Sequence, residues 1–413
     1  MNKQIVLVLS PSIPYDMVPH AGGKTHNYYL KKLNEDFELF LVTCGIEKER
    51  ERSDLDKYGI KHSVLYLRMN TISRGCRLIF NLESKFNPYN RYSGLLANTS
   101  VLYYMKSIKK LRQNGFYPDI VLCEWTETAV LIGFIKKVFP DAKIVVDEVD
   151  VTFQRYQRRA QFETNRIRKK LAELRYKRLK EMELSLLDCS DLVLVQNEKD
   201  VSLLAREKIP VQKIQMIAPY FMNFTNVKYQ PEGKNILFFG AMNRPENYLS
   251  AIWFIENVIP LISDRQMRFV IAGGNPHPKL HAYASERVQV LGYVEDMAPL
   301  FSKALCFCAP LILGAGIKVK VIEAMSAGLP TLTNSIGIEG IPAKNGIDYI
   351  HCETADDYAK NIEMLMDHKF DILSLSCNSK ALIQNHFNIE SSYLSLQRRF
   401  AQLIDNKPIS GSF

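Results

Sequence analysis

The sequence predicts an α/β protein built from two doubly wound parallel sheets, each in a domain of its own. With 413 residues, the chain is long enough for two ordinary hydrophobic cores. Short apolar runs alternate with amphipathic helical segments through both halves, and this alternation favours parallel sheets with helices on both faces. Glycine turns follow several predicted strands, and open parallel sheets bind ligands at the carboxyl ends of their strands.

The first half contains five predicted strands and ends in a linker. These strands span residues 5–9, 37–43, 119–123, 143–147 and 191–196. Gly22 and Gly23 follow the first of them and stand at a helix start, where free N–H groups bind anions. Residues 216–235 are polar, proline-bearing and non-periodic, which is typical of a linker. We therefore expect the first domain to comprise residues 1–215.

The second half repeats the pattern. Its predicted strands span residues 235–240, 267–273, 288–291, 305–309, 330–333 and 349–351. Helical segments separate most of these strands, which again favours a doubly wound sheet, expected over residues 216–385. A last amphipathic helix is predicted over residues 387–404.

Composition indicates a soluble globular protein, with 47% hydrophobic and 23% charged residues. The sequence has no apolar run long enough to span a membrane, and its amino terminus enters a strand without a signal-peptide pattern, so we expect a cytoplasmic protein. The eight cysteines show no metal-ligand spacing and are expected to be reduced thiols. Neither a metal site nor a cofactor is expected.

Most of the excess positive charge lies in one segment. Residues 155–183 hold eleven basic and four acidic residues, whereas the whole chain has a net charge of +9. Such a helix is usually a solvated face, but its charge also suits an anionic membrane surface, with the protein peripheral on the inner face of the membrane, or an acidic acceptor. Nucleic acid is not expected as a partner, because aromatic stacking residues do not recur through the segment.

Residues 314–330 (GAGIKVKVIEAMSAGLP) combine a glycine turn, a helix and a stop signal before a new strand. Ile317, Val321 and Met325 form a helical apolar stripe that can pack on a sheet. Lys318 then lies at the mouth of the helix and Glu323 about one turn further on. An alternative interpretation is that Glu323 only pairs with Lys320 on a solvated helix face.

Residues 291–340 resemble the donor-binding half of the retaining family-4 glycosyltransferases, and residues 236–260 are similar to the opening strand and helix of the same domain. The resemblance implies the GT-B fold, in which two Rossmann-like domains face a cleft, and it implies that residues 386–413 return to the first domain as a helix. It further implies a retaining, hexosyltransferase-like enzyme. Such an enzyme transfers a sugar from a nucleoside diphosphate sugar to a glycan or lipid-linked acceptor, in cell-envelope polysaccharide or glycolipid assembly.

The resemblance also implies roles for individual residues. Glu323 matches the glutamate that binds the ribose, and the strand end at Gly292 matches the base-binding position. Lys318 and Arg244, without a metal, are expected to stabilise the departing diphosphate. The expected donor-binding set is Gly22, Gly23, Gly240, Gly273, Gly292, Tyr293, Val294, Gly314, Ala315, Gly316, Ile317, Lys318 and Glu323, and the expected catalytic residues are Lys318, Arg244, Asp150 and His20.

The chain departs from the family pattern at three positions. The family usually has an acidic residue in contact with the donor sugar where this chain has Ala315, and an arginine where it has Ala241. A first-domain histidine of many members falls at Val149. The departures at Ala315 and Val149 motivate an alternative function, a catalytically inactive nucleotide-sugar-binding partner protein. A nucleotide-sugar epimerase of the same fold is a further alternative, but the quoted motifs do not support it.

Two catalytic candidates have ordinary structural alternatives. His20 precedes Gly22 and Gly23 and either contacts substrate or is a solvated loop residue. Asp150 follows a strand and either has a catalytic or acceptor role or is the N-cap of the basic helix.

Overall fold

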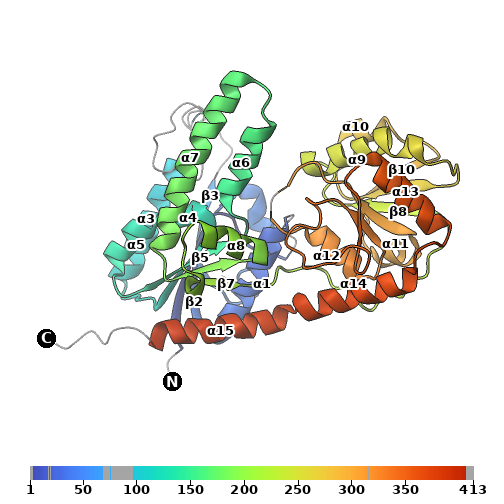
Figure 1. The fold of residues 1–413 in the computed structure, drawn as a ribbon. Helices are drawn as coiled ribbons and strands as arrows, with labels where there is room; N and C mark the ends of the chain where they lie inside the picture. The colour runs from blue at the N-terminus through green and yellow to red at the C-terminus, as the bar shows by residue number, and fades with distance from the viewer. Residues whose placement is uncertain are drawn as a thin grey trace. The chain divides into compact units, whose positions relative to one another are not determined.

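The computed structural model describes residues 3–16, 18, 20–67, 75, 96–314 and 316–405. Its contacts divide the chain into two units, the first comprising Met1–Tyr220 with Ile389–Phe413 and the second Phe221–Asn388. Each unit contains one parallel sheet covered by helices (Figure 1). In the described part of the chain, no helix is long and apolar enough to cross a bilayer.

The first unit contains a seven-stranded parallel sheet in the order β3-β2-β1-β4-β5-β6-β7. Its strands are β1 (Ile5–Ser10), β2 (Glu38–Ile46), β3 (Lys61–Leu67), β4 (Ile120–Glu124), β5 (Lys143–Glu148), β6 (Leu192–Val195) and β7 (Ile214–Met216). The order places β1 and β4 side by side at the centre, with the chain reversing direction across the sheet between them. Ligands of doubly wound sheets bind at such a switch point.

Helices cover both faces of this sheet. They are α1 (Ala21–Asp36), α3 (Asn98–Gln113), α4 (Trp125–Ala129), α5 (Ile132–Val138), α6 (Thr152–Phe162), α7 (Arg166–Asp188), α8 (Glu198–Arg206) and α15 (Ile389–Asp405), with 3₁₀ turns at Glu47–Arg52 and Val211–Lys213. Alternate strand residues face two separate cores, one closed by α1 and α15 and the other by α3, α5 and the inner end of α7. The C-terminal helix α15 is tied to α1, since the Tyr393 hydroxyl donates to the carbonyl of Lys32 at 2.8 Å.

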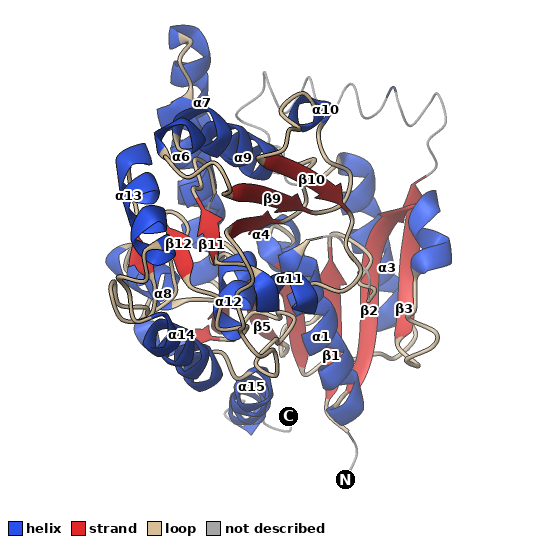
Figure 2. Ribbon diagram, turned by 90° about the vertical axis from the view of Figure 1, so that its right-hand side faces the viewer, coloured by secondary structure: helices blue, strands red, loops and turns tan. Residues whose placement is uncertain are grey.

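The second unit contains a six-stranded parallel sheet in the order β10-β9-β8-β11-β12-β13 (Figure 2). Its strands are β8 (Asn235–Phe239), β9 (Arg268–Ala272), β10 (Val288–Gly292), β11 (Cys306–Ala309), β12 (Thr331–Thr333) and β13 (Ile350–His351). Its helices are α9 (Pro245–Asn257), α10 (Pro278–His281), α11 (Ala298–Lys303), α12 (Val319–Ser326), α13 (Ala355–Met366) and α14 (Ile372–His386), with a 3₁₀ turn at Ile259–Leu261. The two predicted parallel α/β sheets are thus confirmed.

The basic segment forms two helices rather than the expected one. The chain leaves the helical conformation after α6, and Asn165 starts α7 by accepting hydrogen bonds from the N–H groups of Ile167 and Arg168, both at 3.1 Å. The interpretation of Asp150 as the N-cap is wrong. The buried Glu183 of α7 instead accepts the first N–H groups of α6, those of Thr152 at 2.8 Å and Phe153 at 2.7 Å.

The first glycine pair also lies elsewhere than expected. The helix begins at Ala21, so Gly22 and Gly23 form its first turn instead of a loop in front of it. The reason is that His20 is the N-cap. Its Nδ1 accepts the Gly23 N–H at 2.9 Å, so the helix starts before the glycine pair and not after it.

Candidate functional site

The predicted donor residues of the second unit lie at the carboxyl edge of its sheet. Gly240, Gly273 and Gly292 follow or end β8, β9 and β10, the three neighbouring strands on one side of the sheet. Two of these turns touch, because a Cβ on Gly273 would lie 1.7 Å from the carbonyl oxygen of Gly240. Only glycine fits there, at a φ of 146°. The edge therefore presents closely spaced backbone groups where a ligand of this sheet type binds.

The exposed residue at this edge is Tyr293, which directly follows the end of β10. Its side chain is 70% exposed, and Gly292 before it has a φ of 72° that turns the chain out of the strand. A solvent-facing aromatic ring beside backbone N–H and C=O groups is suited to stack on a flat heterocycle. Tyr293 belongs to the predicted base-binding position.

Helix α12 begins one residue after Lys318, which occupies the N-cap position. Its ammonium donates to the carbonyl of Gly316 and lies 3.6 Å from Oε2 of Glu339. The two charged groups are nearly buried. Lys318 is therefore a cation held at the helix mouth by a carboxylate, a pairing that the sequence did not reveal. Ala315, in the same turn, lies outside the described residues.

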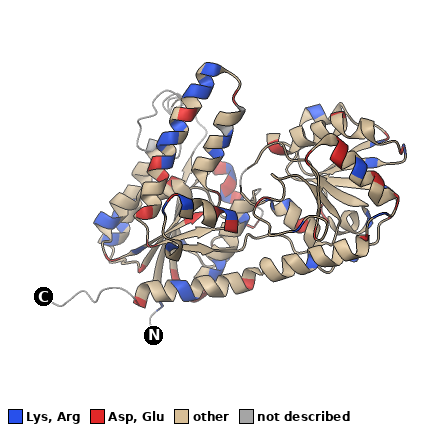
Figure 3. Ribbon diagram, in the orientation of Figure 1, with Lys and Arg blue, Asp and Glu red and all other residues tan. Residues whose placement is uncertain are grey.

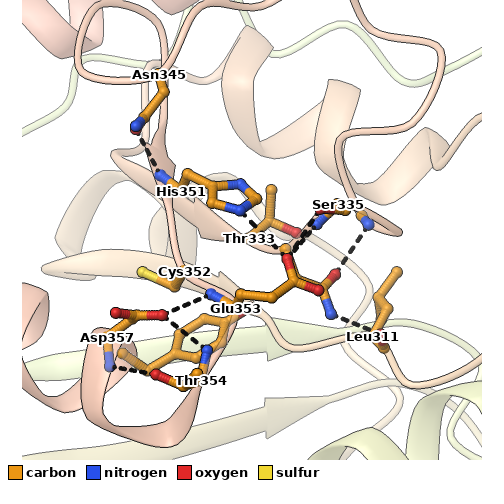
Figure 4. Close-up of polar contacts among 12 residues, drawn as sticks. Leu311, Thr333, Ser335, Asn345, His351, Cys352, Glu353, Thr354 and Asp357 are labelled. Carbon is orange, nitrogen blue, oxygen red and sulfur yellow. Dashed lines mark hydrogen bonds and ion pairs between the residues drawn. The ribbon is translucent and has the colours of Figure 1, made fainter.

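A polar network fixes the loop that carries Glu339. Figure 4 shows Glu353 between Ser335 and His351, where its Oε2 accepts the Ser335 N–H at 3.1 Å and the Ser335 hydroxyl at 2.9 Å. His351 Nε2 lies 3.2 Å from the same oxygen. Asn334 donates to the carbonyl of Leu311 at 2.7 Å, which joins the ends of β11 and β12. Glu339 thus lies on a loop whose start is held by the segments that follow β11 and β13.

Glu323, the predicted ribose ligand, lies in α12 and is partly exposed. Its Oε1 accepts the backbone N–H of Met222 at 3.2 Å. Lys320, its partner in the alternative interpretation, donates its ammonium to Oδ1 of Asn247, and Glu323 acts on that ammonium electrostatically. Glu323 thus lies in the middle of α12 and is held to the segment at the start of the second unit.

Lys320 is the functional candidate that the sequence analysis missed. Its ammonium lies beneath the glycine edge, because a Cβ on Gly240 would lie 3.1 Å from it, and it is 5.1 Å from the ring centre of Phe238. Burial lowers the pKa of Lys320 to about 7, and repulsion from Lys318 and Arg244 acts in the same direction against attraction by two glutamates. A partly desolvated ammonium in such surroundings gains most from an anionic ligand.

Arg244 lies at the N-cap of α9 and is half exposed. Its Nη2 is 2.6 Å from Oε1 of Glu246 in the first turn of the same helix. Because Arg244 and Lys318 both affect the pKa of Lys320, the three cations lie in one neighbourhood at the carboxyl edge of the sheet. The structure therefore brings together the two predicted cations and adds a third.

In the first unit the glycine turn of α1 is packed against the ends of β4 and β5. A Cβ on Gly22 would lie 2.6 Å from Cγ1 of Val149 and 3.2 Å from Cζ2 of Trp125. Trp125 is itself unusual, with a φ of 62° immediately after β4. Such backbone strain in a non-glycine residue often marks a functional site. His20 lies beside this tryptophan, with 6.0 Å between the ring centres.

A row of polar residues lies under α1 at the same sheet edge. Ser10, Glu124 and Asp147 end or nearly end the adjacent strands β1, β4 and β5, and all three are buried. Glu124 accepts the Ser10 hydroxyl and lies 3.2 Å from Nε2 of His26. Burial lowers the pKa of His26 to about 3 and raises the pKa of Glu124. Burial also raises the pKa of Asp147 to about 7, so burial disfavours charge throughout this row beneath α1.

Asp150, a predicted catalytic residue, is partly exposed and lies 3.7 Å from Arg155 Nη1. Next to it, Glu148 and Glu183 form a buried carboxyl pair around the Thr126 hydroxyl, which reaches Glu148 Oε1 at 2.9 Å and Glu183 Oε1 at 3.3 Å. Burial and mutual repulsion raise the pKa of Glu148, and burial raises the pKa of Glu183 to about 8. The sequence signal for this pair was weak, since glutamate is rarely buried.

Comparison with known proteins relates most of the second unit to a known family. Residues 233–368 match the family of glycosyl transferases group 1. A protein of the cps region of Klebsiella pneumoniae is 21% identical over 189 residues, and a phosphatidyl-myo-inositol mannosyltransferase of Mycobacterium leprae is 29% identical over 114 residues. The matches cover 43% and 26% of this chain and 49% and 30% of those proteins, so they span at most about half of the relatives' length.

Solved structures are similar over nearly the whole chain. HepE from Anabaena in complex with UDP has a TM-score of 0.68 at 10% identity, covering 97% of this chain and 100% of that one. Sucrose-phosphate synthase from Thermosynechococcus elongatus has a TM-score of 0.67 at 14% identity, covering 98% and 100%. At such low identity these likenesses show the fold, which is GT-B.

Proposed function

We propose that this GT-B protein, whose residues 233–368 belong to the glycosyl transferases group 1, is a retaining glycosyltransferase. It transfers a sugar, hexosyl in type, from a nucleoside diphosphate sugar to a hydroxyl of a glycan or lipid-linked acceptor. The observation that carries the proposal is the group of three cations, Lys318, Lys320 and Arg244, at the glycine edge of the family-matching sheet. Such a group suits the diphosphate of a donor.

The proposed reaction breaks the bond between the sugar anomeric carbon and the diphosphate oxygen and forms one to the acceptor oxygen. The acceptor proton passes to the departing phosphate oxygen, on the face from which the acceptor enters. Negative charge develops on the diphosphate as its bond to the sugar breaks. The cations and the N–H groups at the start of α12 stabilise that charge, so the protein needs no metal for this step.

We assign donor contacts to three further side chains. Glu323 binds the ribose hydroxyls, and Tyr293 stacks on the base. Glu339 takes the place of the family acid that is absent at Ala315, because its carboxylate lies beside Lys318 at the same glycine turn. Its loop is anchored through Ser335 and Glu353, which is what a residue that orients a sugar requires.

Two observations bear on the acceptor and the cellular role. The relative from the cps region of Klebsiella pneumoniae supports a place in cell-envelope polysaccharide assembly, and the mannosyltransferase of Mycobacterium leprae supports a lipid-linked acceptor. A lipid-linked acceptor would place the protein peripherally on a membrane. In the first unit, His20 and Asp150 are proposed to contact the acceptor.

The second candidate function is a catalytically inactive partner protein that binds nucleotide sugars. It is favoured by Val149, whose apolar side chain packs on Gly22 where many members of the family have a histidine. The same packing also fits an active enzyme with altered contacts, and the three cations serve catalysis better than simple binding. Donor hydrolysis or sugar transfer distinguishes the two candidates.

A thermal-shift panel of UDP, GDP, ADP and their sugars tests the donor proposal. A ligand that binds only the folded state raises the melting temperature by mass action, so the preferred nucleotide gives the largest shift. In that nucleotide's presence, Glu323→Ala should weaken binding by roughly 1–3 kcal/mol, whereas the exposed Glu286→Ala should not. A panel in which no nucleotide shifts the melting temperature contradicts the proposal.

A further inference from the structure

The outer half of α7 carries an exposed apolar stripe. Ile167, Leu171 and Leu174 are 75%, 48% and 46% exposed. Their spacing of four and three residues places them on one face of the helix. Single exposed apolar residues are ordinary, but three in a row on one helix face indicate an interaction surface. We refer to these three residues as the α7 stripe.

Basic residues flank the stripe on both sides. Between residues 166 and 177 the helix carries one acidic residue, Glu173, and six basic ones: Arg166, Arg168, Lys169, Lys170, Arg175 and Lys177. At 100° per residue, Lys170 lies to one side of the stripe and Arg168 to the other. Figure 3 shows lysine and arginine concentrated along this part of α7. An apolar centre with cations along both margins is the pattern of a helix that lies in a lipid interface.

The stripe is remote from the core of its own unit. The buried residues of α7 are Leu179, Glu183 and Leu187, all in its inner half. The outer half, about 20 Å long, contributes none of the buried residues of α7, and α6 and α7 pack together as a hairpin that stands out from the sheet of the first unit (Figure 1). Glu183 fixes the base of the hairpin by capping α6. The hairpin thus projects from the sheet with its base fixed, and the outer half of α7 is amphipathic.

We infer that the α7 stripe docks the protein on an anionic bilayer. The three apolar side chains enter the boundary between headgroups and acyl chains, and the flanking cations contact anionic headgroups. Within the basic segment, the inference assigns membrane binding to residues 166–177. Arg155 is left out because it forms ion pairs with Asp150 and Glu127. It rests on the proposed function in one respect, since a lipid-linked acceptor requires the enzyme at a membrane.

The apolar centre of the stripe favours a bilayer over nucleic acid. A nucleic-acid surface of this kind would present cations with aromatic side chains on which bases stack, whereas the stripe consists of isoleucine and leucine. Cations alone would bind either polyanion, but only a bilayer also takes up aliphatic side chains. The test therefore has to remove the cations and the aliphatic side chains in separate variants.

Co-sedimentation with vesicles provides the test. The full-length protein should sediment with phosphatidylcholine vesicles that contain phosphatidylglycerol, and much less with pure phosphatidylcholine. Arg168→Gln with Lys170→Gln should weaken binding roughly 25-fold at low salt, at about fivefold per cation. Leu171→Gln with Leu174→Gln should weaken it at least tenfold and remove the binding that persists at higher salt.

Matched control variants change similar residues elsewhere. Lys137→Gln with Lys360→Gln removes two exposed cations, and Leu102→Gln with Leu373→Gln removes two exposed leucines. Both controls should sediment like the wild type. Equal recovery with neutral and anionic vesicles, stripe variants that behave like their controls, or preferential binding of single-stranded RNA that competes with the vesicles would each overturn the inference.

The same variants separate this inference from the donor proposal. Nucleotide-induced thermal shifts should be identical in the stripe variants and the wild type, because the stripe lies in the first unit and the proposed nucleotide contacts of Lys318, Glu323 and Tyr293 lie in the second. Vesicle binding without any nucleotide shift contradicts the proposed function alone. Nucleotide shifts without vesicle binding contradict the membrane inference alone.

Discussion

The ammonium of Lys318 lies 3.6 Å from Oε2 of Glu339, with the two side chains 9% and 12% exposed. A nearly buried pair of this kind is costly to leave half-formed, so each side chain holds the other in place. Lys318 stands at the helix mouth and Glu339 on an anchored loop, and the pair therefore offers a cation and a carboxylate at one glycine turn. A nucleoside diphosphate sugar needs both, one for its phosphates and one for its sugar hydroxyls.

Replacing Glu339 by glutamine should separate sugar binding from nucleotide binding. Glu339→Gln removes a charged acceptor, so affinity for the nucleoside diphosphate sugar should fall about tenfold or more. Affinity for the nucleoside diphosphate alone should be unchanged or higher, because Lys318 loses its competing carboxylate. Calorimetric titration of both ligands measures the difference, with Glu286→Gln as the control. An equal loss for both ligands would show that Glu339 only positions Lys318.

Lys320 should take up a proton when a nucleoside diphosphate binds. Burial lowers its pKa to about 7, from an ordinary value of 10.5, and a nearby dianion would raise it again. Affinity should therefore fall as the pH rises above about 7. Calorimetry at about pH 8, above the phosphate pKa of about 6, in buffers of different ionisation enthalpy measures the uptake.

The variant Lys320→Met should bind without this proton uptake and with lower affinity. It should not be less stable than the wild type near neutral pH, because the folded state no longer has to accommodate a poorly solvated amine. The exposed Lys360→Met is the control. If Lys320→Met takes up the same number of protons as the wild type, another group is responsible.

The buried carboxyl pair should make the stability of the protein fall with rising pH. Glu183 has a pKa of about 8 in the folded state, and the pKa of Glu148 is also raised, whereas both ordinary values are 4.5. The folded state therefore binds more protons than the unfolded state between about pH 4.5 and 8, so stability is lost as the pH rises through that range.

Glu148→Gln should flatten this dependence. The amide oxygen can still accept the Thr126 hydroxyl, and one of the two titrating carboxyls of the pair is removed. Melting temperatures measured across the range should fall less steeply in Glu148→Gln than in the wild type or in Glu286→Gln. Parallel curves for all three proteins would show that the pair does not control the pH dependence.

Much of the fold followed from local patterns in the sequence. The β-branched runs such as IVLVLS and KIVVDE predicted strands, and the GAGIKVKVIEAMSAGLP segment predicted α12 and the strand after it, because apolar periodicity and glycine stops are local signals. The hairpin α6–α7 was not predicted, since its break at Asn165 is a short polar turn inside a continuous basic pattern.

The site was predictable only where its residues share a motif. Lys318 and Glu323 stand in one helix, but Glu339 approaches Lys318 through the loop after β12, which no local pattern specifies. Lys320 entered the sequence analysis only in the alternative interpretation, as part of a solvated face, yet its ammonium lies against Gly240 at the end of β8. Such contacts depend on how helices and strands pack against one another. This packing leaves no periodic pattern in a single sequence.

The last prediction concerns stabilisation of the departing diphosphate. Lys318 donates to the carbonyl of Gly316 at the mouth of α12, and Lys320 and Arg244 lie in the same neighbourhood. If these cations and the helix N–H groups take up the developing charge, transfer should persist in excess EDTA. Lys318→Ala should then lower kcat by about 10²-fold or more, as expected for loss of one stabilising donor in the transition state. KM for the donor should change much less, because the lysine acts mainly on charge that appears during bond breaking. The test compares transfer rates with and without EDTA for the wild type, Lys318→Ala and the exposed control Lys360→Ala. If EDTA abolishes activity and Lys318→Ala is as active as the wild type, a metal stabilises the leaving group and this lysine does not.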